Sequence, residues 1–435
     1  MEKAHKKIVR SWIMYDWANS AFATTIMAAV LPVFFSEVAC AGVDKNIASS
    51  YFAFSITIAM LIIAVAAPIL GAISDHSGSK KRFLLFFLIL GILGTVCLTG
   101  VSKGMWVFAS LCYIVGRVGF AGANTFYDSL LPHVAGSDNI DNISAKGYAY
   151  GYLGGGILLA INLLMIMKPG YFGIPNAEWG SRLSFLTVAF WWAIFSIPLF
   201  RNVPEPHVFL LKKESIHPVR AGYQRLMKTF KEIRRFKELV KLLIAFWLYN
   251  DGVGTIIAMA VMFGKEIGIG SSHLIGSILL VQFLGLPFTL IFGKLPLKLG
   301  TKRSILLALC IYALVTILGY FMSRPIHFWL LAILVSMVQG GTQALSRSMY
   351  GSMSPISKSA EFFGFYNMSS KFAGLVGPAL FGVVSRITGT SRLSILAIII
   401  FFIIGGLILT TVDHQKGIEA ARLAEEEEKA GQELP

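Results

Sequence analysis

Long apolar runs alternate with short polar loops along the whole chain. A helix that crosses a bilayer needs about 20 mostly apolar residues. Twelve runs approach or exceed that length, and the longest polar break between them is 201–238. The pattern therefore predicts an all-α polytopic membrane protein with two six-helix halves, 1–200 and 239–412. The expected helices are 11–36, 48–74, 83–101, 105–131, 145–167, 183–200, 239–264, 272–295, 304–322, 326–352, 361–387 and 392–412.

Composition agrees with a chain that is solvated mostly by lipid. Of the 435 residues, 55% are hydrophobic and 14% are charged, whereas a soluble domain carries about 25% charged residues. The mean hydropathy is +0.69. Helices satisfy their own backbone hydrogen bonds, which suits them to such an environment.

The net charge of +15 is distributed unevenly between the two sides of the predicted bundle. Loops on the side opposite the termini hold mostly single basic residues. Because cytoplasmic loops carry the excess of Lys and Arg, both termini and the linker are expected to be cytoplasmic, in a cell (inner) membrane. The charge is thus a topology signal and predicts no nucleic-acid partner. The basic positions in the loops on the terminus side are Lys80, Lys81, Arg82, Lys298, Lys302, Arg303 and Lys358.

Two further cytoplasmic segments are expected. Apolar residues recur at helical spacing from Val219 to Val240 among many Lys and Arg, which predicts a basic amphipathic helix at the membrane surface. This helix reads as a strap between the halves, although a protein-binding role stays open. The tail 413–435 is acidic and is expected to be solvated or frayed.

Several chemistries are disfavoured by what the sequence lacks. Its four cysteines are widely spaced and form neither a disulfide framework nor a metal pattern, so no metal or cofactor is expected. No GxxxxGKS/T, HExxH or GxSxG stretch occurs, which argues against ATP as the driver and against an intramembrane enzyme. We expect a monomer.

The two halves carry an internal repeat. The stretch GAISDHSGSKKR from Gly71 corresponds to GKLPLKLGTKR from Gly293, and YDSLLP from Tyr127 corresponds to YGSMSP from Tyr350. Asp16 in YDWANSAF is likewise echoed by Asp251 in YNDG. Parallel six-helix repeats are typical of one kind of secondary transporter, with the substrate site between the halves at mid-membrane.

The stretch GxxxDxxGxKKR resembles the loop signature of the major facilitator superfamily. The resemblance extends to the twelve helices, and it implies a gating role for the matching positions. YDWANSAF and YNDG are similar to the branch that includes vacuolar amino-acid effluxers linked to autophagy and their bacterial relatives, which implies amino-acid transport. The signature positions are Gly71, Asp75, Gly78, Lys80, Lys81 and Arg82.

Ionisable residues inside the apolar runs mark the inward-facing helices. A charge at the bilayer centre costs about 2.5–3.5 kcal/mol on the insertion scale, so such residues need water or a partner. The expected helices 3, 6, 9 and 12 contain none between their ends and can face lipid. Helices 1, 4, 7, 10 and 11 are expected to face inward, and they hold Asp16, Arg117, Asp128, Asp251, Arg347 and Lys371.

Helical spacing sorts the polar residues into faces and depths. Asn124 shares a face with Arg117 and Asp128. Asp128 and Arg347 lie near the cytoplasmic ends and are expected to latch helices together, so we group them with the gating positions. Asp16 could also merely pair with a neighbouring helix or cap a break. The candidates for binding substrate or a coupling ion are Asp16, Asn19, Arg117, Asn124, Asp251, Gln339, Gln343 and Lys371.

These features predict a secondary active transporter that works by alternating access. Opposed charges across a central cavity suit a small zwitterion such as an amino acid or a short peptide, and protons are the default coupling ion. We expect Asp251 and Lys371 to be neighbours for which substrate or a proton competes, although Lys371 could merely neutralise Asp251. A lipid or drug exporter of the same fold and a non-transporting membrane sensor remain the alternatives.

Overall fold

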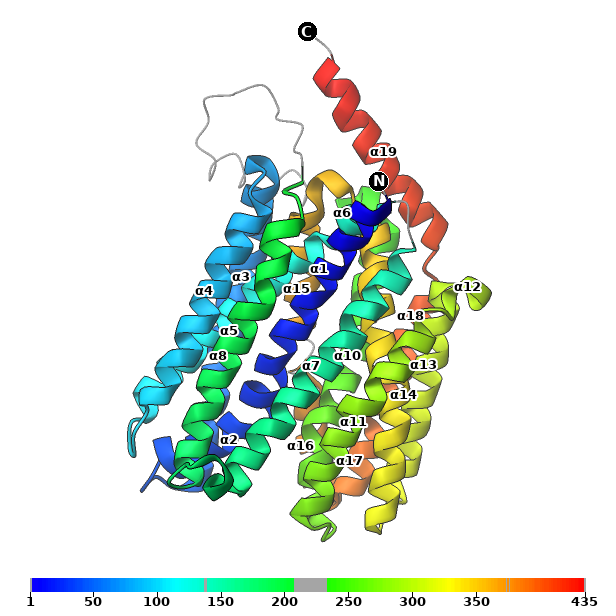
Figure 1. The fold of residues 1–435 in the computed structure, drawn as a ribbon. Coiled ribbons are helices and arrows are strands. Elements are labelled where there is room, and N and C mark those ends of the chain that lie inside the picture. Colours follow the sequence, from blue (N-terminus) through cyan, green and yellow to red (C-terminus); the bar gives the residue numbers. More distant parts are fainter. Residues whose placement is uncertain (1, 137–138, 207–232, 373, 375, 434–435) are drawn as a thin grey trace.

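The computed structural model describes residues 2–136, 139–206, 233–372, 374 and 376–433, and the described part consists of helices without strands. The helices stand side by side in one bundle (Figure 1). Those of the N-terminal half are α1 (Glu2–Ala21), α2 (Leu31–Phe34), α3 (Lys45–Ser77), α4 (Lys80–Cys97), α5 (Trp106–Ser129), α6 (Leu131–Ala135), α7 (Ile140–Met167) and α8 (Ala177–Asn202). Those of the C-terminal half are α10 (Lys237–Glu266), α11 (Ser271–Phe292), α12 (Pro296–Leu299), α13 (Thr301–Tyr320), α14 (Pro325–Ser352), α15 (Ser359–Phe372), α16 (Val376–Thr388), α17 (Ser391–Ala397), α18 (Ile399–Thr410) and α19 (His414–Glu433).

The twelve predicted crossings are present. In the described part, eleven helical segments are long and apolar enough to span a membrane. The remaining crossing is the eleventh in chain order, and it consists of α15 followed by the shorter apolar α16. Each half has its own hydrophobic core. One core runs from Trp12 to Val203 with a single residue from the other half, Ala360, and the second core runs from Phe236 to Val412.

Hydropathy placed several helix starts too late. The fifth crossing begins at Ile140 rather than 145, because the Asn139 side chain accepts a hydrogen bond from the amide of Asn142 and caps the helix. The sixth begins at Ala177 rather than 183, where Asn176 caps the amide of Trp179 in the same way. The apolar pattern does not detect a helix start whose first turn is polar, whereas the capping residue before that turn does indicate it.

Three crossings expected as continuous helices are interrupted, and the twelfth is divided at Ile398 between α17 and α18. The first passes from α1 into π-helical turns at Phe22–Val30 and, after α2, again at Phe35–Ala39. The eleventh, expected as 361–387, is broken between α15 and α16. Pro378 lacks an amide hydrogen and its ring clashes with the carbonyl four residues back, at Gly374, which favours a break at this point.

Two segments that were expected to be cytoplasmic flank the C-terminal half. Most of the predicted amphipathic linker helix falls in 207–232, outside the described residues. The tail, expected to be solvated or frayed, forms α19, which packs on the bundle: its Glu425 accepts from the amide of Ile356 at 2.5 Å, and Glu427 pairs with Arg235 at 2.6 Å. Ile356 lies in the short helix Ile356–Lys358 that leads into α15.

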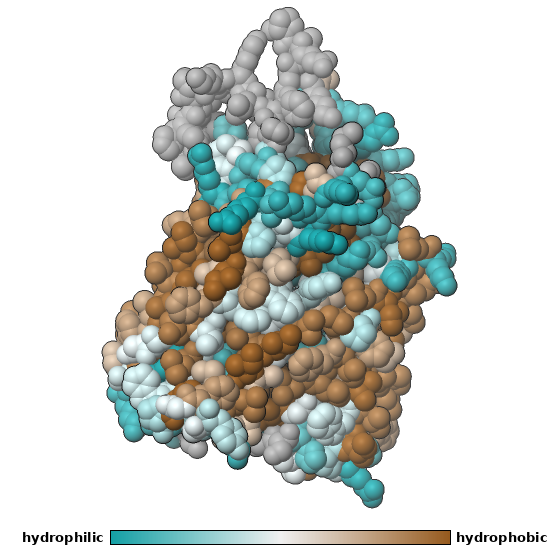
Figure 2. Space-filling view, viewed as in Figure 1, coloured by the Kyte–Doolittle hydropathy of each residue, from teal (hydrophilic) through white to brown (hydrophobic). Residues whose placement is uncertain are grey.

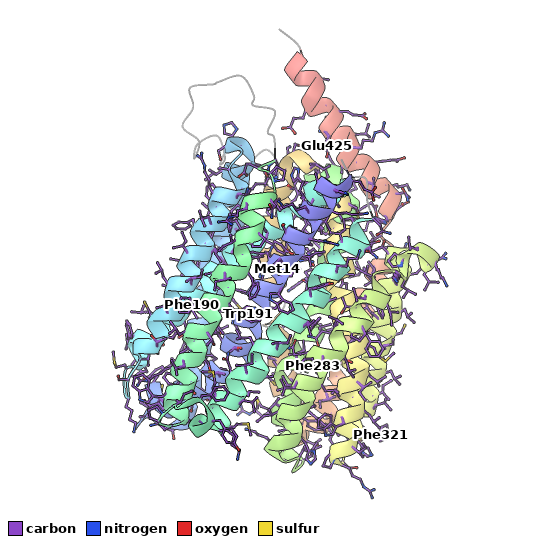
Figure 3. All side chains as sticks on the ribbon, in the orientation of Figure 1. Met14, Phe190, Trp191, Phe283, Phe321 and Glu425 are labelled. Atoms are coloured by element: carbon purple, nitrogen blue, oxygen red, sulfur yellow. The ribbon has the colours of Figure 1, made fainter. Side chains whose placement is uncertain are left out.

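The exterior is apolar along most of the length of the bundle. Figure 2 shows a hydrophobic belt below the hydrophilic side chains that gather at the end carrying both termini. The third and sixth crossings, expected to face lipid, contribute exposed Phe86 and Ile89 of α4 and Phe190 of α8, and Phe190 is labelled in Figure 3.

The two ends of the bundle can be told apart in solution. Glu425 lies at the end that carries both termini and Phe321 at the opposite end (Figure 3). Leu297 on α12 and Tyr171, between α7 and α8, are 71% and 85% exposed. Because the Lys/Arg bias predicts a cytoplasmic terminus end, we expect Tyr171→Cys to react with an impermeant maleimide added to intact cells, and Leu297→Cys to react only after permeabilisation.

Labelling is measured in a background without the four native cysteines, and each variant serves as the control for the other. Inverted accessibility would reverse the proposed orientation. Labelling of both positions from outside would contradict the number of crossings between them.

Candidate functional site

The halves meet through two contacts related by the internal repeat. On one side α3 packs against α15, and on the other α11 packs against α7. A Cβ on Gly71 would collide with the backbone of Ala360, and one on Gly293 would collide with the Cβ of Ala145. The repeated glycine therefore lets backbones approach closely at both contacts, as small residues do between membrane helices.

The second repeated glycine makes the turn after each of these helices. Gly78 has a φ of +60° and Gly300 a φ of +80°, a region that strongly favours glycine. These turns precede α4 and α13, which carry the basic residues of the two repeated stretches in their first turns.

Asp75 joins the halves at the first contact. Its carboxylate accepts hydrogen bonds from the amides of Ala360 (3.2 Å) and Glu361 (2.8 Å), at the N-terminus of α15. It also pairs with Lys80 at 2.9 Å, and the two side chains are 0% and 3% exposed. A negative charge at a helix N-terminus is favoured by the helix dipole. Asp75 thus holds α15 against α3.

The basic signature residues all lie on α4 but have different surroundings. The Lys80 ammonium also donates to Ser359 at 2.5 Å and lies 2.9 Å from His133, so it reaches across the interface. Lys81 donates instead to carbonyls at the end of α8 within its own half, including Phe200 at 2.9 Å. Arg82 is exposed.

At the second contact the carboxylate comes from α7, and not from α11, which is the helix that corresponds to α3 in the repeat. Position 297, which corresponds to Asp75, is an exposed leucine. Asp141 at the start of α7 instead accepts from Thr301 of α13 at 2.7 Å and from Ser348 of α14. Each contact therefore contains a buried carboxylate, but the two are built differently.

A third cluster lies between these contacts, around Arg347 of α14. Its guanidinium is 3.2 Å from Asp16 of α1 and 3.0 Å from Asp128 of α5. It donates further to the hydroxyl of Ser144 on α7 at 2.9 Å and to its carbonyl at 3.0 Å. One residue of the C-terminal half is thereby held by three helices of the N-terminal half.

Aromatic rings enclose this cluster. The guanidinium carbon of Arg347 lies 4.3 Å from the ring centre of Tyr148, 5.0 Å from that of Trp12 and 5.7 Å from that of Tyr127. Trp12 stacks on Tyr127 with centroids 4.5 Å apart. Arg347 is 1% exposed, so its charge interactions are shielded from water.

One helical turn deeper, each half carries a pair of amides. The Asn19 amide donates to Asn124 at 2.7 Å in the N-terminal half. The Gln343 amide donates to Asn250 at 2.7 Å in the C-terminal half. Asn124, Asn250 and Gln343 are half-buried and retain hydrogen-bonding groups beyond these single bonds.

Arg117 lies eleven residues before Asp128 on α5, which is about 16 Å along a helix. It is half-buried, its guanidinium donates to the Tyr113 hydroxyl at 2.7 Å, and no carboxylate of the described residues lies within 4 Å of it. Gln339 on α14 is also half-buried.

Asp251 of α10 caps the outer segment of the broken crossing. One carboxylate oxygen accepts from the amide of Gly377 in α16 at 2.9 Å, and the other is buried without a hydrogen-bond partner among the described residues. Lys371 falls in α15, but its side chain lies outside the described part, so its pairing with Asp251 stays a prediction. Asp16 and Asp251 correspond in the repeat but have different partners.

Known proteins with similar sequences identify the family of this chain. A family model described as "Vacuole effluxer Atg22 like" matches residues 4–422. The chain belongs to the Atg22-like family. This Atg22-like chain is 38% identical to the uncharacterised MFS-type transporter YxiO of Bacillus subtilis, over 97% of this chain and 98% of YxiO. It is 24% identical to autophagy-related protein 22 of Yarrowia lipolytica, over 86% of this chain and 77% of that protein.

Solved structures support the same fold. The proton:xylose symporter XylE, of the major facilitator superfamily, superposes with a TM-score of 0.76 at 14% identity, covering 97% of the Atg22-like chain and 99% of XylE. The Atg22-like chain is thus a multi-pass membrane transporter of the major facilitator superfamily, and its relatives are transporters rather than enzymes.

Some residues of this site were missed by the sequence analysis. Asp141 and Ser144 lay in the stretch 132–144 that hydropathy left as a loop, although Asn139 is a recognisable cap. His133 and Ser359 lie at helix ends, where polar residues are ordinary. Asn250 directly precedes Asp251, and a neutral amide in an apolar run is a weaker signal than the adjacent acid.

Proposed function

We propose that this Atg22-like chain is a secondary active transporter that carries a small polar solute, an amino acid or a short peptide, by alternating access between its halves. The coarse activity, membrane transport, belongs to the family. Arg117 and the two amide pairs, which lie one or more helical turns deeper than the Arg347 cluster, support the choice of solute.

Arg117 is the observation that carries this proposal. A guanidinium inside a membrane-spanning helix is costly unless it is hydrated or paired. Arg117 is half-buried, and its hydrogen-bond partner is a neutral phenol. Guanidinium groups bind carboxylates through two parallel hydrogen bonds, so the carboxylate of an amino acid or peptide would supply the missing partner.

The two amide pairs, Asn19–Asn124 and Gln343–Asn250, support the same class of solute. One pair lies in each half, and both offer hydrogen-bond donors and acceptors without a net charge. A lipid or drug exporter is expected to have a binding site with few fixed charges and few amides. The polar composition of this region therefore favours a polar solute over an apolar one.

We test the proposal by comparing ligands with and without a carboxylate. Amino acids, dipeptides and their C-terminal amides are screened by thermal shift of the purified protein. Because a hydrogen bond to a charged group contributes about 1.5–3 kcal/mol, Arg117→Gln should weaken binding of the acid roughly 10- to 100-fold. It should change binding of the amide far less.

Arg182→Gln is the matched control, since Arg182 pairs with Glu178 on α8. It should leave both affinities unchanged. Equal losses for acid and amide in Arg117→Gln would assign Arg117 to structure. Binding of lipids or drugs alone would favour the exporter alternative.

We further propose that the protein works as a monomer in the cell membrane, with both termini cytoplasmic and protons as the coupling ion. The two halves of one chain supply both sides of the interface, so no second copy is needed. Carboxylates between the halves are the candidates for carrying the proton.

Asp251 and Lys371 provide a separate prediction about this interface. If the two are neighbours, removing one strands the other charge in a low-dielectric site. Asp251→Asn should then reduce substrate binding and thermal stability more than Asp251→Asn combined with Lys371→Met. A double-mutant cycle on both quantities measures the coupling, and additive losses would show that the residues act independently.

A further inference from the structure

The Arg347 cluster contains one positive and two negative groups. Asp16 and Asp128 each contact the same guanidinium, at 3.2 Å and 3.0 Å. Both aspartates are 7% exposed and Arg347 is 1% exposed. If both carboxylates were ionised, the cluster would hold an uncompensated negative charge away from water.

The guanidinium has little capacity left to compensate the second carboxylate. Its Nε donates to the Ser144 hydroxyl, Nη1 donates to Asp128, and Nη2 donates to both Asp16 and the Ser144 carbonyl. Four of its five N–H groups are therefore in use. Each carboxylate receives a single bond from it, rather than the bidentate pair that a guanidinium can offer.

The other groups that face the cluster are neutral at physiological pH. They are phenols on α1, α5, α7 and α15, and an amide on α15. Neither aspartate has a second cationic partner within 4 Å in the described part of the chain, and the side chain of Lys371, one turn beyond the amide, lies outside that part. The facing groups are Tyr15, Tyr127, Tyr148, Tyr366 and Asn367.

An unpaired carboxylate in such a site is strongly disfavoured by the loss of hydration, and buried acids avoid this penalty by binding a proton. We infer that the Asp16–Asp128–Arg347 cluster is a proton-binding site, which holds one proton while the halves are closed at the terminus end and releases it when they separate there. This inference rests on the proposed alternating-access transport and adds the place of the coupling proton.

The release follows from where the three residues come from. Both aspartates belong to the N-terminal half and Arg347 belongs to the C-terminal half, so opening at this end takes the guanidinium away and admits water. Hydrated aspartates ionise well below neutral pH. The closed form thus binds one more proton than the open form, and acidification should favour the closed form by up to roughly tenfold per pH unit.

The experiment measures this closure without any substrate. Spin labels are attached at Arg201→Cys on α8 and Leu297→Cys on α12, two exposed positions in opposite halves, in a background without native cysteines. Distances are recorded by double electron–electron resonance in lipid nanodiscs from pH 5.5 to 8.5. In the wild-type sequence the closed population should grow as pH falls.

Substitutions test whether the proton binds to Asp16 and Asp128. Asp128→Asn and Asp16→Asn each remove one negative charge, as the proton does, so each should give a closed population that is high and independent of pH. Glu178→Gln is the control, because it removes one carboxylate charge that is already paired with Arg182 inside α8, within one half. It should keep the pH dependence. Thermal unfolding of each variant shows that it is folded.

Several results would overturn the inference. These are a wild-type population that does not respond to pH, a response that survives Asp128→Asn and Asp16→Asn, or one that disappears in Glu178→Gln. A response that appears only in Lys371→Met would show that Lys371, rather than a proton, supplies the second positive charge. Since the measurement contains no solute, failure of the proposed amino-acid transport would leave its result intact, and the converse also holds.

Discussion

Arg347→Gln should open the terminus end of the bundle and lower thermal stability. The substitution strands two carboxylates that share one guanidinium and removes hydrogen bonds to Ser144. Breaking a buried ion pair by removing one partner costs about 3–5 kcal/mol. Most of this loss falls on the closed form, because the cluster exists only when the halves are together. The measurements are thermal unfolding in detergent and the distance between labels on the two halves.

A second substitution checks the cause. Adding Asp128→Asn to Arg347→Gln removes one stranded charge and should recover part of the loss. Arg182→Gln breaks a less buried pair within one helix and should cost less than 1 kcal/mol. If Arg347→Gln were no more damaging than Arg182→Gln, the cluster would not be what holds the halves together.

Asp75→Asn should slow transport while leaving substrate affinity near normal. The carboxylate bonds two amides of α15 and the Lys80 ammonium, and all of these contacts lie at the terminus end, away from Arg117. The amide cannot neutralise Lys80, which is left buried, so the closed form loses about 3–5 kcal/mol. Proteoliposome uptake and equilibrium binding, measured on the same preparation, separate rate from affinity.

The internal repeat offers the matched control for this prediction. Leu297→Asn places the same residue at the corresponding position of the second half, where the side chain is exposed, and should change stability by less than about 0.5 kcal/mol. Asp75→Asn combined with Lys80→Met should regain part of the closed population. Loss of equilibrium binding in a folded Asp75→Asn protein would assign Asp75 to the substrate site instead.

Hydropathy and the repeat were enough to predict the crossings and the two halves, because each crossing must satisfy its own apolar length. They could not predict the ends at Ile140 and Ala177, which depend on side-chain caps, nor the π-helical turns after Ala21. The break before Val376 had a local signal in Pro378, but a proline within an apolar run predicts either a kink or a break.

The candidate site was only partly accessible to sequence analysis. Spacing along one helix gives the face and depth of a residue, so Asp128 and Arg347 could be predicted to lie near the same end of the bundle. Spacing does not say which helices are neighbours, so it could not predict that Asp16 contacts Arg347. Asp141 shows the same limit, since its partners lie 160 and 207 residues away in the chain.

The Arg347 cluster also has a consequence for biosynthesis. Arg347 follows Asp16 by 331 residues and Asp128 by 219. At a synthesis rate of about 5–20 residues per second, Asp128 waits on the order of 10–40 s for its partner. During that time the N-terminal half is inserted with both acids uncompensated, and it must keep them hydrated or protonated within the membrane. The first six crossings expressed alone should therefore be a better target for membrane quality control than the last six, whose stranded member is a single arginine able to extend toward the lipid headgroups.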